Sequence, residues 1–571
     1  MKHCIKYIFL FFFLMSCLQV QAQRSKKKKK SIVTKKVTTS SNINQPITGV
    51  VLDTVKPNVL TITSTFKPFL RSASKINFTA SMPILDTNRL SLAYSIPAQN
   101  LFFTYQPVPI KPIAYFAENT FKWVNSNYIK LGFGNYAQPY AEAAISFGSP
   151  ESNIYSIIAK YHQAKGNLLY QETTQALLKA TAEINSISNH DLVVSVGYSG
   201  SAQNRYGTNP NLVFTKDQLK QNFNTIQADV QLHSKAASEF GIQYHPNLKA
   251  NVFSDHQQGT EFNALLQAPF SKSISKKLSV DLGILADLSF YKNNNLSISN
   301  NVFSIKPQLK FTGDDLLISA AIQPTWNNNE LEILPDVQAT YHLAKEKFMV
   351  IGGYKSFLQK NTYQSLAAIN PFLDQPKEFK NSITNEIFGG LKGAVGKHFS
   401  FLGKLSFIKT NQQVLFANDT AQSKSQNFNI LYEPDVKSIR LSGEVSYVDQ
   451  NKFSLITGVS FTQFTAQEKY DKVYGFLPLE INSSIRYHVL KDVVLKSDIY
   501  IWDGAYYRIK NDVSGKSKMV VDLNVGTEVK VLKNTYFYLE LNNLFNNEYQ
   551  RWNQYNVFGF NVVGGVVYSF N

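Results

Sequence analysis

Residues 518–531, KMVVDLNVGTEVKV, alternate apolar and polar side chains. The apolar residues of one parity are Met519, Val521, Leu523, Val525, Val529 and Val531, and the polar residues of the other are Asp522, Asn524, Glu528 and Lys530. Successive side chains of a β-strand point to opposite faces, so a strand here has one apolar and one polar face. The stretch predicts a strand that lies between an apolar and an aqueous environment.

The same alternation recurs in residues 492–502 (DVVLKSDIYIW) and 438–447 (SIRLSGEVSY), and it continues from about residue 120 to the end. A soluble sandwich also alternates, but a sandwich of this length without covering helices is improbable. Closing the sheet removes its unpaired edges. A closed barrel also satisfies its backbone hydrogen bonds without water, so it is stable in lipid. We therefore predict an all-β fold, a transmembrane antiparallel β-barrel over residues 120–571.

Turn signals set the expected number of strands. Short polar turns are expected at residues 148–152, 188–191, 234–238, 273–277, 312–315, 344–347, 396–398, 448–452, 490–492 and 532–534. Longer connections rich in Asn and Gly are expected between them, including residues 200–224, 356–381 and 411–426. Short turns on the periplasmic side and long loops outside are typical of outer-membrane barrels, and ten short turns imply about 22 strands.

Residues 1–22 have the features of a secretory signal peptide, with Lys2 and Lys6 before an apolar run and cleavage expected after Ala22. The alternative is lipoprotein processing at Cys17, because residues 14–17 (LMSC) resemble a lipobox. The only cysteines are Cys4 and Cys17, so the mature chain needs no disulfide framework. An exported barrel of this kind is expected in the outer membrane of a Gram-negative cell.

The chain carries a net charge of +18, of which the first 120 residues supply +13. Residues 23–57 form a basic arm. Its residues 24–30 read RSKKKKK and include Lys26, Lys27, Lys28, Lys29 and Lys30. Nucleic acid is not an expected partner of an exported protein. The arm is either a solvated, disordered tail or a segment that binds anionic lipid headgroups or an acidic periplasmic protein.

The C-terminal residues carry a resemblance to a known family. Val562, Val566, Tyr568 and Phe570 share one parity with Phe558 and Phe560, and the terminal aromatics Tyr568 and Phe570 are similar to the signal read by the barrel-insertion machinery. The preceding stretch NNLFNNEY resembles the element before the last strand of TonB-dependent receptors, through Asn543, Leu544, Phe545, Asn546 and Tyr549. This resemblance implies an outer-membrane transporter or receptor. The QAQ at residues 21–23 and the loops rich in Asn and Lys also resemble proteins of the Bacteroidetes.

Residues 58–119 depart from that family's pattern. They are too few for a usual plug domain, and Pro97, Pro107, Pro109 and Pro112 favour extended backbone. The departure argues against coupling to TonB. A barrel of about 22 strands still needs something in its lumen. The candidates are this extended segment, inward-folding long loops, or a partner protein. If the segment does not enter the lumen, it lies in the periplasm outside the barrel.

Binding and catalytic signals are few. The loop WDGAYY is the best candidate external binding loop, through Trp502, Asp503, Tyr506 and Tyr507, since aromatic rings beside a turn stack on ligands. No metal-ligand spacing occurs among the histidines, and VGYSGS at 196–201 lacks the spacing of a nucleophile elbow and is better explained as a turn. We therefore expect no enzyme activity and no cofactor.

The polar parity includes four carboxylates that either line a conduit or only solvate the inner wall: Asp498, Asp522, Glu528 and Glu540.

Three functions remain open at this point. The first is a transporter or receptor for an unknown solute. The second is a structural or assembly barrel that recruits a periplasmic partner through its N-terminal segment. The third is a passive porin with an open lumen.

Overall fold

The structure is a computed structural model. It describes residues 127–149, 152–185, 187, 189–207, 213–344, 347–418, 427–449, 452–508 and 514–570. The expected signal peptide (1–22), the basic arm (23–57) with Lys26 to Lys30, and the extended segment (58–119) lie outside the described residues.

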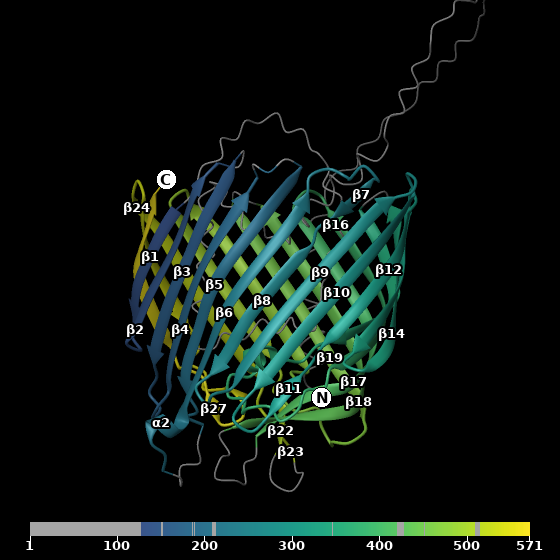
Figure 1. The fold of residues 1–571 in the computed structure, drawn as a ribbon. Helices are drawn as coiled ribbons and strands as arrows, with labels where there is room; N and C mark the ends of the chain where they lie inside the picture. The colour runs from purple at the N-terminus through teal and green to yellow at the C-terminus, as the bar shows by residue number, and fades with distance from the viewer. Residues whose placement is uncertain are drawn as a thin grey trace, which may run out of the picture. The chain divides into compact units, whose positions relative to one another are not determined.

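The described chain forms one closed antiparallel barrel of 22 strands (Figure 1). Neighbouring strands pair in sequence order, and the last strand, β28 (Asn561–Phe570), pairs with the first, β1 (Asn127–Gly134), from Asn127 opposite Phe570 to Gly134 opposite Val563. This pairing leaves no open edge in the barrel, which is what a sheet needs in a medium without water. The predicted fold class and the number of strands are confirmed.

The other barrel strands have the following bounds: β2 (Gln138–Gly148), β3 (Asn153–Lys165), β4 (Glu172–Ile184), β5 (His190–Asn204), β6 (Lys220–Ser234), β8 (Asn247–Asp255), β9 (Thr260–Ser273), β10 (Leu278–Lys292), β12 (Val302–Thr312), β13 (Leu316–Asn327), β14 (Glu330–Ala344), β15 (Phe348–Gln359), β16 (Ser382–Val395), β17 (Phe399–Asn418), β18 (Phe428–Asp449), β19 (Phe453–Gln467), β20 (Leu479–Leu490), β21 (Val493–Trp502), β24 (Val520–Leu532) and β25 (Thr535–Asn542). The shorter elements lie in the connections: α2 (Lys216–Leu219), β7 (Ile242–Tyr244), β11 (Ser297–Ser299), α3 (Tyr363–Ile369), β22 (Tyr506–Arg508), β23 (Ser514–Lys516), β26 (Gln550–Trp552) and β27 (Tyr555–Asn556).

Nine of the ten expected short turns connect successive barrel strands at one end of the barrel, which we call the short-turn end. The tenth, expected at residues 234–238, lies in a longer connection, residues 235–246, which contains β7 and joins β6 to β8 at the same end. The opposite end, which we call the mouth, carries the longer connections. These are shorter than the sequence suggested, because residues 200–204 and 220–224 belong to β5 and β6, and residues 411–418 extend β17. Three mouth connections are themselves tight: residues 135–137, 256–259 and 328–329. The strands therefore include at the mouth some polar residues that composition assigned to loops.

The two faces of the wall follow the predicted parity. In β24, Met519 just before the strand and Val531 within it are 54% and 50% exposed, whereas Asp522 and Glu528 are 3% and 6% exposed. The apolar residues therefore face outward, where lipid replaces water, and the polar residues face the lumen.

Two local expectations change. VGYSGS lies within β5 rather than in a turn. The last strand begins at Asn561, so Phe558 and Phe560 precede it, and Phe558 is buried against Tyr136. Trp326 and Trp502 both lie at strand ends, but only Trp326 faces outward, at 40% exposed.

Candidate functional site

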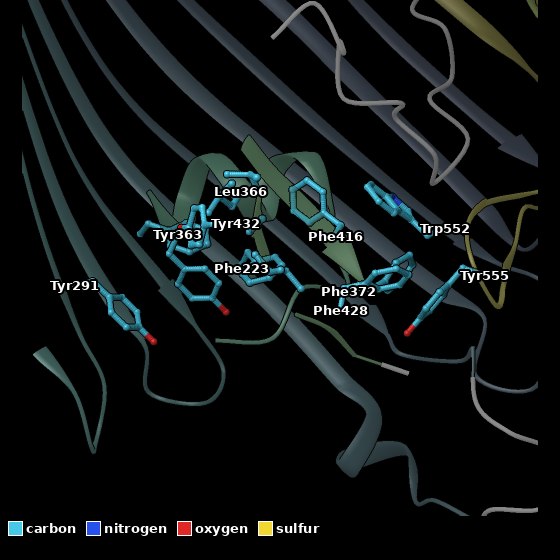
Figure 2. Packing of buried hydrophobic residues seen from close by; sticks show 14 residues of the cluster. Phe223, Tyr291, Tyr363, Leu366, Phe372, Phe416, Phe428, Tyr432, Trp552 and Tyr555 are labelled. Atoms are coloured by element: carbon cyan, nitrogen blue, oxygen red, sulfur yellow. The ribbon is translucent and has the colours of Figure 1, made fainter. Parts of the chain in front are cut away.

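Fourteen buried residues form an aromatic cluster at the mouth, which we call the mouth cluster (Figure 2). The wall contributes Phe223, Phe253, Tyr291, Val414, Phe416, Phe428 and Tyr432, and the loops contribute Tyr363, Leu366, Ala367, Phe372, Leu373, Trp552 and Tyr555. The loop members come from two connections. The α3 loop is residues 360–381, between β15 and β16, and the β26–β27 loop is residues 543–560, between β25 and β28.

The helix of the α3 loop begins with a capping box. The Thr362 hydroxyl accepts the backbone N–H of Ser365, and the Thr362 N–H donates to the Ser365 hydroxyl. These bonds satisfy donors that a helix leaves open at its start. The resulting turn buries Tyr363, Leu366 and Ala367 against the inner wall. Figure 2 shows Tyr363 and Leu366 lying beside Tyr432 and Phe223 of the strands.

Two carboxylates from the β8–β9 hairpin bind the start of α3. Glu261 accepts the backbone N–H of Tyr363 at 2.6 Å and that of Gln364 at 3.1 Å. Asp255 accepts the Tyr363 hydroxyl at 2.8 Å and the Gln375 amide at 2.8 Å. Burial, with the negative charge of Asp255, raises the pKa of Tyr363 well above its ordinary value. The phenol therefore stays protonated and keeps donating to Asp255.

Asparagine amides fix the base of the α3 loop. Asn361 and Asn381 lie at its two ends, and the Asn361 N–H donates to Asn381 Oδ1 at 3.0 Å. Asn300 and Asn381 exchange a reciprocal pair of amide hydrogen bonds at 2.8 and 2.7 Å. Lys360 also contacts Asp287 at 2.5 Å. Because both ends are bonded to each other and to the wall, the loop has a closed, rigid base.

The far end of the α3 loop reaches other sectors of the wall. Gln203 of β5 donates to the Pro371 carbonyl at 2.7 Å, and Gln221 of β6 donates to the Leu373 carbonyl at 3.2 Å. On β18, the Phe428 N–H donates to the Phe372 carbonyl at 3.1 Å. The loop thus extends from its base at β15 and β16 to strands on both sides of the lumen.

The β26–β27 loop begins with the family-like motif. Asn543 and Asn546 have φ of +48° and +50°, a region that asparagine tolerates better than most residues. The Asn543 amide donates to the carbonyls of Asn547 and Phe558 at 2.9 and 3.0 Å, and its Oδ1 accepts the Asn547 N–H at 2.9 Å. These contacts give the motif a structural role, because one side chain holds both ends of the loop together.

Tyr549, the last residue of the motif, contacts the wall and the predicted external loop. Its hydroxyl donates to Asp522 at 2.6 Å, and its ring lies edge-on to Trp502 at 5.2 Å. Leu544 and Phe545 are exposed.

The predicted binding loop is only partly accessible. Trp502 is buried, at 3% exposed, whereas Tyr506 and Tyr507 are half-buried in β22. Asp503 forms an ion pair with Lys516 at 2.5 Å. The four residues do not share one exposed face, so a ligand role for this loop stays a proposal for Tyr506 and Tyr507.

Aromatic rings from three connections meet over the lumen. Phe372 of the α3 loop stacks on Tyr555 of the β26–β27 loop with ring centroids 3.5 Å apart and an interplanar angle of 17°. Tyr206, between β5 and β6, lies edge-on to both, at 6.1 and 5.2 Å. Six to eight barrel strands separate each of these connections from the next. The rings therefore join distant sectors of the mouth.

The four candidate luminal carboxylates all face inward, and each has a partner. Glu540 pairs with Lys130 at 2.8 Å, Glu528 with Lys496 at 2.6 Å, and Asp498 with Arg486 at 3.2 Å, while Asp522 accepts the Tyr549 hydroxyl. These pairings favour a role in the inner wall over a role as free ligands.

Tyr568 and Phe570 lie on the outer face at the short-turn end, where their rings stack at 6.0 Å. Recognition by the insertion machinery stays a proposal for them.

Across the part of the chain that the structure describes, no three metal-ligating side chains come together. No described helix is long and apolar enough to cross a membrane.

The comparisons with known proteins agree on the fold. No family model and no curated protein matches the chain. Among solved structures, it is similar to the FrpB iron transporter from Neisseria meningitidis (TM-score 0.61, 11% identity, 78% of this chain and 81% of that chain). It is also similar to the ferric enterobactin receptor PfeA from Pseudomonas aeruginosa (0.57, 10%, 78% and 80%) and to the ferripyoverdine receptor of the outer membrane of that bacterium (0.57, 11%, 78% and 72%).

These matches place the chain in a structural class: closed 22-stranded barrels with the fold of outer-membrane receptors. Identities of 10–11% establish the fold alone. The barrel that the resemblance to TonB-dependent receptors implied is therefore confirmed.

The mouth cluster was not expected from the sequence, although a signal for it exists. Phe223, Phe253, Tyr291 and Phe416 stand on the polar parity of their strands, near the mouth. A large aromatic residue on the luminal parity needs cover, because water is a poor solvent for its ring. Such residues near one end of several strands predict a loop that folds over them.

Proposed function

We propose that the chain is an outer-membrane receptor or transporter that takes a solute from outside through a mouth closed by its own loops. The observation that carries the proposal is the contact of the α3 loop with the β26–β27 loop at Phe372 and Tyr555. A passive porin needs a permanently open lumen, and loops that contact each other across the mouth oppose that function. The solved structures of similar fold are named as a transporter and receptors of iron compounds. The solute of this chain is left undetermined, and coupling to TonB is not part of the proposal.

Purified protein in liposomes tests this function. The candidate solutes are those that support growth only of cells that contain the protein. They are added outside the vesicles, and their entry is compared with entry into vesicles without protein. Solute-dependent flux that survives deletion of residues 23–57 supports a transporter. A large conductance to small ions without any solute indicates a porin and refutes the proposal.

The alternative, a structural or assembly barrel, places its function in residues 23–119, which lie outside the described residues. It predicts that deletion of residues 23–57 abolishes capture of a periplasmic partner while flux stays undetectable. The same two samples therefore separate the two functions.

A further inference from the structure

The outer wall of the barrel has a groove with a volume of about 320 Å³ between β19 and β24. Its lining includes six residues of the outward parity: Phe453 of β19, Ile485 and Tyr487 of β20, Leu495 and Ser497 of β21, and Val525 of β24. Tyr487 and Leu495 are 36% and 41% exposed on the lipid-facing side. Ligand pockets in proteins have volumes of about 300–1,000 Å³, so the groove is large enough to hold part of a ligand.

A small residue recesses the wall at this place. Ser497 stands opposite Ile485 in the pairing of β20 with β21, and opposite Val525 in the pairing of β21 with β24. Because the serine side chain is shorter than both neighbours, it forms the floor of a hollow with apolar sides. An empty hollow forfeits the dispersion contacts of its lining. In a membrane, a hydrocarbon chain is the molecule that restores them.

A row of rings marks the depth of the groove in the membrane. His398, Tyr447, Phe453 and Tyr487 lie next to one another, with ring centroids 5.7, 5.8 and 6.2 Å apart along the row. All four lie near the short-turn end, and Tyr487 comes three residues before the end of β20. Aromatic rings gather where hydrocarbon meets the headgroups. The groove therefore begins at the headgroup level of the periplasmic leaflet and extends into the hydrocarbon.

Exposed lysines lie in the three short turns that adjoin the groove. They are Lys452 between β18 and β19, Lys491 between β20 and β21, and Lys533 between β24 and β25. None of the three makes an ion pair or a side-chain hydrogen bond with another described residue. These turns hold three lysines against Asp492, a net charge of +2, or +1 when Asp449 at the end of β18 is counted. Cationic side chains at this level attract anionic lipid headgroups.

We propose that this groove, which we call the lipid groove, binds one acyl chain of an anionic phospholipid whose headgroup lies at the three lysines. The distance fits such a molecule. Lys491 and Leu495 are four residues apart, which corresponds to about 13 Å of strand. One leaflet contributes about 15 Å of hydrocarbon, so a single lipid reaches from the turn into the groove. The site does not depend on the proposed function, since it needs only a barrel in a membrane.

Native mass spectrometry of the purified, delipidated full chain tests the site. The protein is titrated in detergent with phosphatidylglycerol or with phosphatidylcholine of the same acyl chains, and the affinity for the first bound lipid is measured. Phosphatidylglycerol is expected to bind more tightly. Lys452→Gln combined with Lys491→Gln is expected to lower its affinity by about 25-fold, about fivefold for each lysine. The affinity for phosphatidylcholine is expected to stay unchanged.

Ser497→Phe tests the groove itself, because the added ring fills the space above the floor. It is expected to abolish binding of the first lipid of either kind. Ala180→Phe is its matched control. Ala180 faces lipid on β4, between Ile157 and Val196, and lies four residues from the short-turn end of its strand, as Ser497 does. This control is expected to bind both lipids as the unchanged protein does.

The lysine variant has a control at the same end of the barrel, Lys276→Gln combined with Lys277→Gln in the turn between β9 and β10. An equal loss of phosphatidylglycerol in this control overturns the site, since it shows attraction to the whole short-turn end. Equal affinities of the unchanged protein for the two lipids overturn the anionic headgroup. Lipid binding that survives Ser497→Phe overturns the groove.

Heat-modifiable gel mobility checks that each variant is folded, and Ser497→Leu fills the same space if Ser497→Phe is unfolded. The titration needs no solute, so its failure leaves the proposed function untouched, and a failed flux assay leaves the lipid result interpretable.

Discussion

A buried ion pair crosses the last strand of the barrel, beside the pairing that closes it. β28 lies between β25 and β1, and Lys130 of β1 reaches over it to Glu540 of β25 at 2.8 Å. The Lys130 ammonium also lies 4.0 Å from the ring centroid of Tyr538. Space for that ring comes from Gly132 and Gly565, where an added Cβ atom would collide with it.

We predict that Lys130→Met destabilises the barrel strongly. The Lys130 and Glu540 side chains are 1% and 10% exposed, so the substitution leaves a carboxylate without its cation in a site with little water. Removing one partner of such a buried pair costs about 3–5 kcal/mol in the free energy of unfolding. Loss of the cation–π contact adds to this cost and is worth about 0.5–2 kcal/mol. The double variant Lys130→Met with Glu540→Gln is expected to recover most of the loss.

The assay is urea unfolding of the protein in lipid vesicles, followed by tryptophan fluorescence. Lys249→Met is the matched control, because Lys249 pairs with Asp229 on the same inner wall at 3.5 Å but is 49% exposed. An exposed pair is worth about 0–1 kcal/mol. Equal losses for Lys130→Met and Lys249→Met would refute the reasoning, as would a double variant no more stable than Lys130→Met alone.

Three further substitutions test the loop anchors. Asn543→Ala removes several hydrogen bonds at a left-handed position and is expected to lower the free energy of unfolding by about 2 kcal/mol in the same titration, and an unchanged midpoint would contradict this. Tyr549→Phe deletes the bond to Asp522 and is expected to cost about 1.5–3 kcal/mol; Tyr506→Phe, which changes a half-buried hydroxyl, is its control. Glu261→Gln weakens the anchor of α3 and is expected to accelerate maleimide labelling of Phe253→Cys, while a protected cysteine there would show that Glu261 does not hold the loop.

The sequence by itself determined the wall of this protein. Alternation such as that of residues 518–531 depends only on the two-residue period of a strand and on the difference between lipid and water, and both are local properties. Nine of the ten expected short turns follow from local turn chemistry in the same way, and the tenth marks a longer connection at the same end, which is why the number of strands was predictable. The motif around Asn543 was recognisable from its residues, although its role as a turn clamp needed the backbone angles.

Only the tertiary structure decided what closes the mouth. Phe372 and Tyr555 lie 183 positions apart in the chain, and nothing in either local stretch names the other as a partner. Closure of the barrel brings β15–β16 and β25–β28 around one lumen, and burial of rings on the luminal parity then selects which loops fold inward. The same long-range geometry buried Trp502 against Tyr549 and paired each predicted luminal carboxylate. Contacts of this kind depend on the diameter and register of a closed barrel, which no single strand encodes.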